Sequence, residues 1–561
     1  MLGKRSLLVG SICLSACTPT PRAVGPIPPV EVQILAINDF HGNLETPPDP
    51  VKVVRRDGSA MTARLGGAAQ LASALAKARE GHAYTITVAA GDLIGASPLT
   101  SAYFLDEPTI DAMNLLGLSV ASVGNHEFDK GSAELLRMQS GGCGKNTTRV
   151  PCRLEPFAGA RFQYLAANVL RADGSTLLPA TAIRQIGPIH IGFIGETLRD
   201  TAIVVTPAGV AGLHFADEAA TANALVPKLK AEGADAIVLL LHQGGRLPET
   251  YVEEGCSGLS GDILPILDKL DPAITMVISG HTHEAYACEL QRGGAARWLT
   301  SAGKYGYLYT DLRLEFDPTT HKQTAERAVN VPVTGELGAD ANVAALVHRY
   351  ADAVQPAAER IVGRLAGVAA KGPGDQESPV ADLIADAQLA ATRPQNRGGA
   401  ELAFINTGGA RTALEPAADG SVTYERIFAL EPFGNDLVVK TLTGTQLKAL
   451  LEQQFKLVNG VAKLNDSILV PSANFHFDYD LKRPMGEHIV AMTVDGKPVQ
   501  PAGRFRVTVN SFLSSGGDGY SVLTEGTDPF DAGIDLDALE AWLGTNPAVP
   551  AVGRITDSTP R

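Results

Sequence analysis

The sequence predicts an α/β protein built from two domains, and three observations lead to this fold class. From residue 30 to about 330, short apolar runs typical of strands alternate with runs typical of helices. Residues 331–362 change character and are expected to form a helical linker, after which a second α/β unit occupies residues 363–555. In the first unit, five strand-like runs lead directly into loops that contain His, Asp or Asn. A chain of 561 residues with 45% hydrophobic residues is long enough for these domains.

The N-terminus is predicted to be a targeting sequence rather than part of the folded domain. A short apolar run, Ser6 to Ala16, follows two basic residues; it is too short to span a bilayer and is typical of a signal peptide. Residues 1–17 end in Leu-Ser-Ala-Cys, which resembles a bacterial lipobox and implies lipid attachment to Cys17. An ordinary cleaved signal with an incidental cysteine is the alternative. Residues 18–29, rich in Pro and Thr, would be a flexible tether.

The remaining cysteines support export. Besides Cys13 and Cys17, four of the six cysteines form two close pairs, Cys143 with Cys152 and Cys256 with Cys288. Neither pair has the C-x-x-C spacing of a zinc site, so two disulfides in an oxidising compartment are predicted, with the connectivity left open. We therefore expect a protein of the bacterial cell envelope, facing the periplasm or the cell surface. The lipid would be its only membrane attachment.

The net charge limits the partners. A formal charge of −14 argues against a nucleic-acid polymer as partner, because binding a long polyanion calls for basic surface. A small phosphate ester is compatible with this charge, since bound metal ions can dominate the local field. The oligomeric state is not indicated by the sequence.

Several segments of the first unit have patterns typical of a strand or a helix. Residues 30–37 alternate as in a strand, and residues 236–242 (AIVLLLH) are typical of a fully buried strand. A helix is predicted with Pro108 near its first turn and Gly117 near its end. Residues 220–233 are predicted to form another helix despite an internal proline.

The five loops that follow strands carry the side chains that bind divalent transition metals. Carboxylates, an amide oxygen and neutral imidazoles are suitable ligands for two such ions, for example zinc, manganese or cobalt. A single histidine after a strand is usually only a polar loop residue, but five such loops at strand ends indicate one shared site. The pattern therefore predicts a two-metal hydrolase. The candidate ligands are Asp39, His41, Asp92, Asn125, His242, His281 and His283.

The motifs NDFHG, GD, GNHEFD, a single His after an apolar strand, and GHTH resemble those of the calcineurin-like metallophosphoesterases. Together with its second unit, the chain is similar to the 5′-nucleotidase family, which includes bacterial periplasmic nucleotidases and UDP-sugar hydrolases. The resemblance covers nearly the whole chain after residue 30. It implies a four-layer α/β/β/α sandwich over residues 30–330, joined by the helical linker to an α/β substrate-binding domain.

The same resemblance implies roles for the ligands. One metal would be held by Asp39, His41, Asp92 and His283. The second would be held by Asp92, Asn125, His242 and His281, with Asp92 as the bridge. Such a pair activates a water molecule for direct attack on phosphorus. His126 would face the substrate, oriented by Asp129, although Asp129 could instead cap a following helix.

Loops of the second unit are expected to select the substrate. By resemblance, two phenylalanines would sandwich the base, while an acid would bind the ribose and an arginine the phosphate. The expected residues are Phe433, Phe512, Asp518 and Arg411, with Asn406 near the base or a neighbouring group. Taken alone, a Phe beside Gly is more often a core residue and a Gly-Gly-Asp run more often a turn. Arg393 and Arg397 are further basic candidates.

The resemblance therefore leads us to expect a metal-dependent 5′-nucleotidase that converts nucleoside 5′-monophosphates to nucleoside and phosphate. Alternatives within the family are hydrolysis of UDP-sugars, of dinucleotides such as NAD, or of 2′,3′-cyclic nucleotides. An interpretation of another class is a lipid-anchored nucleotide-binding surface protein with an inert hydrolase domain. The complete set of ligand motifs argues against this last interpretation.

Overall fold

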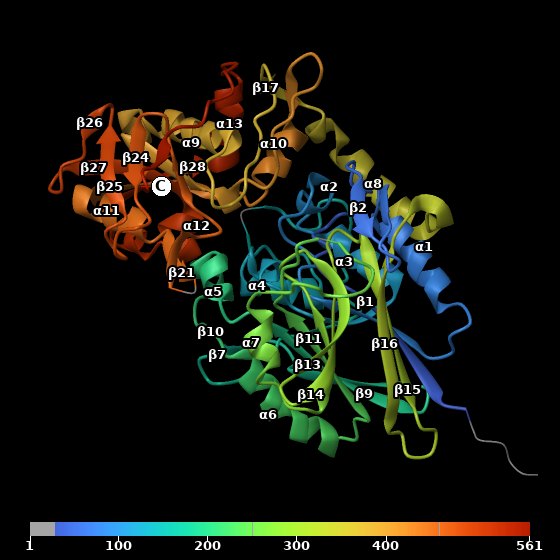
Figure 1. Cartoon of the computed structure of the whole chain (residues 1–561). Coiled ribbons are helices and arrows are strands. Elements are labelled where there is room, and N and C mark those ends of the chain that lie inside the picture. Colours follow the sequence, from blue (N-terminus) through green and yellow to red (C-terminus); the bar gives the residue numbers. More distant parts are fainter. Residues whose placement is uncertain (1–27, 148, 250, 459, 561) are drawn as a thin grey trace, which may run out of the picture.

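A computed structural model describes residues 28–147, 149–249, 251–458 and 460–560. Cys17 and the predicted signal peptide lie outside this part, as does most of the predicted tether. The chain has a mixed α/β fold of two domains. In Figure 1 the N-terminal domain runs from blue to yellow-green, and the C-terminal domain, in orange and red, lies beside it at the upper left.

The N-terminal domain contains two six-stranded sheets. In spatial order, the first consists of β16 (Gln323–Pro332), β15 (Leu308–Phe316), β1 (Val30–Ile37), β4 (Thr85–Ala90), β5 (Leu118–Ser122) and β6 (Gln163–Leu165). The second consists of β13 (Ala285–Arg292), β14 (Ala295–Ala302), β12 (Ile274–Ser279), β11 (Ala236–His242), β9 (Ile189–Thr197) and β8 (Thr181–Ile186). Strands β1, β4, β5 and β6 are parallel, as are β9, β11, β12 and β14, so each group brings its carboxyl ends to one edge.

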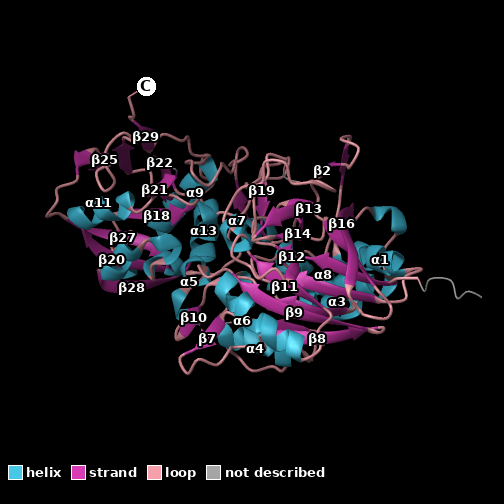
Figure 2. Cartoon of the chain, turned by 60° about the horizontal axis from the view of Figure 1, so that its bottom comes forward, coloured by secondary structure: helices cyan, strands magenta, loops and turns pink. Residues whose placement is uncertain are grey.

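The two sheets pack face to face between helices, which confirms the four-layer expectation (Figure 2). An apolar layer that includes Val88, Phe193 and Leu240 fills the space between the sheets. Helices α1 (Ala68–Arg79), α3 (Glu107–Leu116), α4 (Ser132–Ser140) and α8 (Ala341–Ala358) cover the first sheet. Helices α6 (Glu218–Ala231) and α7 (Ile263–Leu267) cover the second. Each sheet thus has both faces buried, which explains the continuous apolar run of β11.

The helix signals were correct for physical reasons. Pro108 occupies the first turn of α3, where a missing N–H costs nothing, and Gly117 ends the helix with a φ of 79°. Helix α6 begins where the Asp217 side chain accepts a hydrogen bond from the backbone N–H of Ala220, and it tolerates Pro227 in its interior. Of the described helices, none combines the length and the apolar character that crossing a bilayer requires.

The linker is helical, as predicted, but it is not a free connector. Helix α8 buries Val343, Leu346 and Tyr350 in the apolar cluster that includes α1 and α3. The same cluster continues into α9 (Pro379–Thr392) and α10 (Tyr424–Leu430) of the C-terminal domain. One continuous core therefore joins the two domains through α8.

The C-terminal domain is built on a five-stranded and a four-stranded sheet. The larger has the order β23 (Leu469–Pro471), β18 (Leu402–Asn406), β27 (Arg504–Asn510), β20 (Asp436–Thr443) and β28 (Thr527–Ile534). The smaller has the order β26 (Lys497–Pro498), β25 (Ile489–Val494), β24 (Phe475–Tyr479) and β29 (Ile555–Asp557). Helices α9, α11 (Gly444–Glu452) and α13 (Asp535–Leu543) complete the domain.

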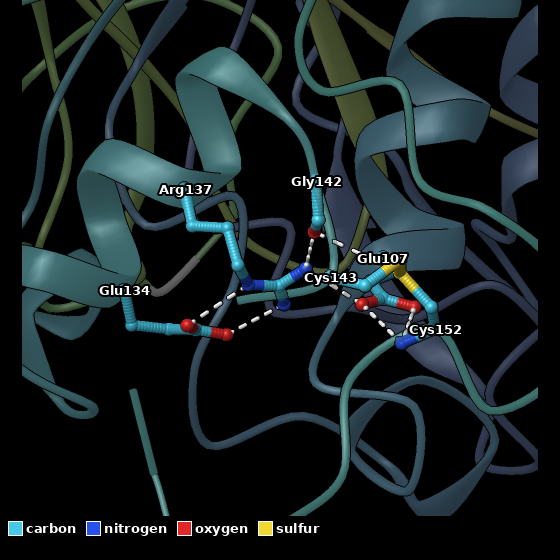
Figure 3. The surroundings of a disulfide bond; sticks show 6 residues. All are labelled: Glu107, Glu134, Arg137, Gly142, Cys143 and Cys152. Atoms are coloured by element: carbon cyan, nitrogen blue, oxygen red, sulfur yellow. Dashed lines mark hydrogen bonds and ion pairs between the residues drawn. A yellow bond between two sulfur atoms is a disulfide. The ribbon is translucent and has the colours of Figure 1, made fainter. Parts of the chain in front are cut away.

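Both predicted cysteine pairs are joined, Cys143 to Cys152 and Cys256 to Cys288. Figure 3 shows how the first is attached to the helical layer. Buried Arg137 of α4 binds Glu134 at 2.6 Å and Glu107 of α3 at 2.7 Å, and Glu107 also accepts a hydrogen bond from the backbone N–H of Cys152. A buried arginine with two carboxylates fixes the base of this loop.

Candidate metal centre and substrate cavity

The candidate ligands meet where the carboxyl edges of the two sheets face each other. In the first sheet, strands β1, β4 and β5 lead into the loops of Asp39, Asp92 and Asn125. In the second sheet, strands β11 and β12 lead into the segments of His242, His281 and His283. The predicted ligands therefore lie together, as expected for loops at a shared sheet edge.

Several of these residues have a left-handed backbone, which is rare for residues other than glycine. The φ angles are 48° for Asp39, 47° for His41, 49° for Asp92, 72° for His281 and 63° for His283. Such conformations persist only where the surroundings enforce them, and they concentrate at functional sites. No signal in the sequence predicted this feature.

One cluster consists of Asp39, His41 and His283, whose ligand atoms lie within 4.8 Å of one another. Nδ1 of His41 donates to the carbonyl oxygen of Gly95 at 2.9 Å, so Nε2 carries the lone pair of the neutral ring. That nitrogen lies 3.1 Å from Nε2 of His283 and 3.8 Å from Oδ1 of Asp39. Burial lowers the pKa of His41 to about 3, which keeps the imidazole neutral and able to bind a metal.

Another cluster consists of Asp92, His242 and His281, and a third group, His41, Asp92 and His126, lies between the two. Nε2 of His242 lies 2.9 Å from Oδ2 of Asp92, and Nδ1 of His281 lies 3.0 Å from Oδ1 of Asn125. Oδ2 of Asp92 is also 3.7 Å from Nε2 of His41 in the first cluster. Asp92 therefore stands between the two clusters.

The donor set fits a pair of divalent cations. His242 directs Nδ1 to the carbonyl oxygen of Ala90 at 2.7 Å, which leaves Nε2 to face the carboxylate of Asp92. When the ring is neutral, Nε2 of His242 and the carboxylate oxygen of Asp92 are both acceptors and face each other without a shared proton. Metal-binding histidines commonly have this arrangement, with the other ring nitrogen held by a backbone carbonyl. Although burial opposes ionisation, His242 and His126 hold the pKa of Asp92 well below its usual range.

Two glycines are required for this packing. A Cβ atom on Gly91 would lie 2.7 Å from Nδ1 of His242, and Gly91 has a φ of 80°. A Cβ on Gly124 would overlap Oδ1 of Asp92. Only glycine lets the two loops approach this closely.

Glu127 supports the site without facing it, a role that the sequence did not identify. Its carboxylate accepts hydrogen bonds from the backbone N–H groups of Asp92 at 2.9 Å, Leu93 at 2.8 Å and Gly124 at 2.6 Å. It thereby ties the loop after β4 to the loop after β5. Its place inside the GNHEFD motif was the only available signal.

The two residues predicted to form a dyad, His126 and Asp129, lie in contact. Nδ1 of His126 lies 2.8 Å from Oδ2 of Asp129, and burial is outweighed by Asp129 and Asp92, which raise the pKa of His126. The alternative role of Asp129 as a helix cap is not supported, because the N-cap of α4 is Gly131. The His126 ring stacks on Phe433 of the C-terminal domain, with centroids 6.1 Å apart and planes at 10°.

One cavity brings the expected substrate residues to the dyad. Its lining includes Asn125, His126, Asn406, Arg411, Phe433, Phe512 and Asp518. Oδ2 of Asp518 accepts hydrogen bonds from Asn406 at 2.7 Å and from Ser467 at 2.6 Å, and burial raises the pKa of Asp518. Both phenylalanines therefore line the cavity, and Phe512 also packs against an apolar cluster of the C-terminal domain.

Some lining residues were missed, and two candidates lie elsewhere. Ser467 and Asn435 also line the cavity, although the sequence around Ser467 gives no motif. Neither Arg393 nor Arg397 is among the lining residues of the described chain. Arg397 instead donates to the carbonyl oxygen of Ala532, because it follows the far end of α9.

Comparison with known proteins agrees with this architecture. Residues 32–285 match the calcineurin-like phosphoesterase family, and residues 358–525 match the 5′-nucleotidase C-terminal domain. Fold, ligand clusters and matched regions thus define a metallophosphoesterase domain followed by a nucleotidase-type domain. The chain belongs to the 5′-nucleotidase family, a family of hydrolases.

Individual relatives are similar to the chain over nearly its whole length. The chain is 28% identical to "Endonuclease YhcR" of Bacillus subtilis over 93% of its own length but only 40% of the length of YhcR. It is 24% identical to the 5′-nucleotidase of Bos taurus, covering 94% of this chain and 91% of that protein. The crystal structure of a 5′-nucleotidase precursor from Thermus thermophilus has the same fold, with a TM-score of 0.74 at 24% identity over 94% of this chain and 100% of that chain.

Proposed function

We propose that the protein is a metal-dependent 5′-nucleotidase, which hydrolyses nucleoside 5′-monophosphates to nucleoside and phosphate. The observation that carries this proposal is that His126, Arg411 and two phenylalanines line one cavity beside the ligand clusters. The metals would be held by Asp39, His41, Asp92 and His283 on one side and by Asp92, Asn125, His242 and His281 on the other. When bound, the two ions would lower the pKa of a water molecule and neutralise charge on the phosphoryl oxygens.

The side chains would perform the remaining tasks. Phe433 and Phe512 stack on the base, and the carboxylate of Asp518 accepts hydrogen bonds from ribose hydroxyls. Arg411 offers its planar guanidinium to the phosphate. Hydrolysis adds water across the P–O5′ bond, and the departing 5′ oxygen takes a proton from Nε2 of His126. Asp129 holds Nδ1 of His126, which keeps Nε2 directed at the substrate.

The protein is proposed to act outside the cytoplasm. Two disulfides in the N-terminal domain are typical of an oxidising compartment. The apolar N-terminal run would direct export, and Cys17 would carry the lipid that anchors the protein to the envelope. Labelling with a radioactive fatty acid, and its loss in Cys17→Ser, tests the anchor.

The experiment that tests the function compares four substrates with the purified full chain: AMP, UDP-glucose, NAD and 2′,3′-cyclic AMP. We expect AMP to have the highest kcat/KM and chelation to abolish its turnover. The name of the relative YhcR gives a reason to include a phosphodiester among the substrates. If the cyclic nucleotide or NAD is cleaved with a higher kcat/KM than AMP, the protein is a phosphodiesterase or a pyrophosphatase and the proposal is wrong.

A further inference from the structure

Asn38 is the first residue of the NDFHG motif and has no role in the mechanism above. It follows strand β1 and is only 3% exposed, although its side chain is a polar amide. A buried amide needs partners for both its nitrogen and its oxygen, because an unpaired polar group in the interior is costly. The partners of Asn38 therefore indicate what its side chain does.

The amide of Asn38 is hydrogen-bonded at both ends, and these bonds define its orientation. Its nitrogen Nδ2 donates to Oδ2 of Asp39 and to the backbone carbonyl oxygen of Gly303, both at 2.7 Å. Its oxygen Oδ1 accepts a hydrogen bond from the backbone N–H of Ala302 at 2.7 Å. The reverse orientation would place the amide oxygen against two other acceptors. Asn38 thus contacts a candidate metal ligand with one hydrogen and the chain around Gly303 with its other bonds.

These contacts fix the carboxylate of Asp39. Its Oδ2 is held by Nδ2 of Asn38, and the backbone N–H of His281 lies 3.0 Å from both carboxylate oxygens. Its Oδ1 lies 3.6 Å from Nε2 of His283 and 3.8 Å from Nε2 of His41. Asn38 therefore occupies one carboxylate oxygen, and the other faces the two imidazoles with which Asp39 is assigned to bind a metal.

Asn38 also joins the two sheets at the edge where the ligand loops meet. It follows β1 of the first sheet, whereas Ala302 is the last residue of β14 in the second sheet and Gly303 comes directly after it. The layer between the sheets is otherwise built around an apolar cluster. A buried polar contact whose groups are all paired favours one arrangement of the elements that it connects. Asn38 is therefore placed to fix the separation between the ligand loops of the two sheets.

A second buried asparagine makes a similar link between the sheets. Asn330 of β16 is 1% exposed, and its Nδ2 donates to the carbonyl oxygens of Ser301 at 2.9 Å and of Val252 at 3.2 Å. Its Oδ1 accepts a hydrogen bond from the hydroxyl of Thr310 at 2.7 Å. In the described chain, no side-chain hydrogen bond of Asn330 reaches a candidate metal ligand. Loss of either amide should weaken the fold, but only Asn38 contacts a ligand.

We propose that Asn38 is a positioning residue of the metal centre. It holds Oδ2 of Asp39 so that Oδ1 faces His41 and His283, and it fixes the distance between the ligand loops of the two sheets. The inference rests on the proposed function for the presence of two metal ions. It adds that the affinity for the ion assigned to Asp39 depends on an amide that does not itself bind the metal.

The test is a cobalt(II) titration of the full chain after removal of metal by dialysis against a chelator. Calorimetry gives the affinity of each binding step, visible absorption reports the surroundings of the bound ions, and thermal unfolding reports stability. Asn38→Ala is compared with the matched control Asn330→Ala. We expect Asn38→Ala to weaken one of two binding steps by about 10–100-fold, the usual effect of removing a group that orients a metal ligand, and to change the cobalt spectrum. Asn330→Ala should lower the unfolding temperature but retain both affinities and the spectrum.

Asn38→Asp is a second variant, which keeps the shape of the side chain but places a carboxylate against Oδ2 of Asp39. It should weaken the same step. Wild-type affinities and spectra in both Asn38 variants would overturn the proposal. An equal loss of metal in Asn330→Ala would also overturn it, because the loss would then come from the fold as a whole, and so would a failure of both Asn38 variants to fold.

Failure of the proposed function can be distinguished from failure of this inference. None of these measurements requires turnover, so a wild type that binds two ions but does not hydrolyse AMP would refute the proposed function alone. A wild type that binds no ion would overturn both proposals.

Discussion

The two halves of the site are built in different ways. The candidate metal ligands of the N-terminal domain follow strands. Five of the seven are buried, with exposed fractions of 0% for Asp39, 1% for Asp92 and 0% for His242, whereas His281 and His283 are half-buried. Phe433 and Phe512 of the C-terminal domain, which we propose sandwich the base, lie in loops or short helices and are half-buried. One half is fixed by sheet edges and backbone geometry, whereas the other depends on loops that meet it from another domain.

Under the proposed function, this difference places chemistry and selectivity in separate parts of the fold. Side chains packed at a sheet edge hold their positions to within the tolerance that metal binding needs. Loops on a second domain can change without displacing those ligands, and one of their contacts with the first half is the stacking of Phe433 on His126. Substitutions in the first half should therefore affect kcat, and those in the second should affect KM.

The largest effect is expected at the centre of the rigid half. Asp92→Asn keeps the shape of the side chain but removes the negative charge that lies between both clusters. We expect AMP turnover to fall to the background rate and bound metal, measured by mass spectrometry, to decrease. Asp57→Asn, at an exposed turn, is the control. Full metal content together with full activity in Asp92→Asn would show that Asp92 is not a shared ligand.

His126→Ala should lower kcat by about 10²–10⁴-fold, the usual contribution of a general acid or base. Metal content should stay unchanged, because His126 is assigned to the substrate. This measurement is decisive, since His126 also lies close enough to His41 and Asp92 to share a cation with them. Loss of metal in His126→Ala would show that His126 is a metal ligand. Asp129→Asn should give a smaller decrease in kcat, since the imidazole itself remains.

In the loop-built half, Phe433→Ala and Phe512→Ala should each raise KM for AMP and change kcat little. Stacking of a base on an aromatic ring contributes about 1–3 kcal/mol. Phe530→Ala removes an exposed phenylalanine of the same domain that does not line the cavity. Steady-state kinetics with the three variants checks the assignment. Equal KM values in all of them would show that Phe433 and Phe512 do not bind the base.

The sequence predicted the rigid half better than the loop-built half, for a physical reason. Strand ends of parallel sheets converge on one edge, so the ligand loops could be placed together from their positions in the sequence. The loops of the C-terminal domain follow no such rule. Arg393 and Arg397 were basic and close in sequence to the Gly-rich turn, but they lie just past the far end of α9 and do not line the cavity.

Side-chain support was also hard to predict. The left-handed backbone of Asp39 and Asp92 and the hydrogen bonds of Glu127 depend on atoms from separate loops. The packing of α8 against both domains was likewise not visible in its amphipathic pattern. A sequence pattern shows which face is apolar but not which partner covers it.

The stability of the C-terminal domain should depend on pH through a buried carboxyl group. Burial raises the pKa of Asp382 in α9 to about 8, despite Arg554 at 3.4 Å, with Glu377 and Asp386 adding to the increase. Because the folded state then holds a proton that the unfolded state releases near pH 4, stability is greatest below pH 4 from this group and decreases as pH rises to 8. Calorimetry of Asp382→Asn should show a weaker decrease over that range. An unchanged pH dependence would mean that Asp382 is ionised in the fold.

The smallest effect is expected where the disulfide loop of the N-terminal domain contacts the C-terminal domain. The guanidinium carbon of Arg149 lies 5.3 Å from the ring centroid of Phe428, and its Nη1 donates to the carbonyl oxygen of Ala102 at 3.1 Å. A cation–π contact at such a site contributes about 0.5–1 kcal/mol, so Arg149→Ala should raise KM for AMP by a few-fold and leave kcat unchanged. Arg149→Lys should restore part of the effect, because a cation remains. Cys143→Ser should act in the same direction, since Arg149 lies between the two linked cysteines. A change confined to kcat in these variants would mean that the loop acts on the metal-binding half, and the separation of the two halves would then fail at this contact.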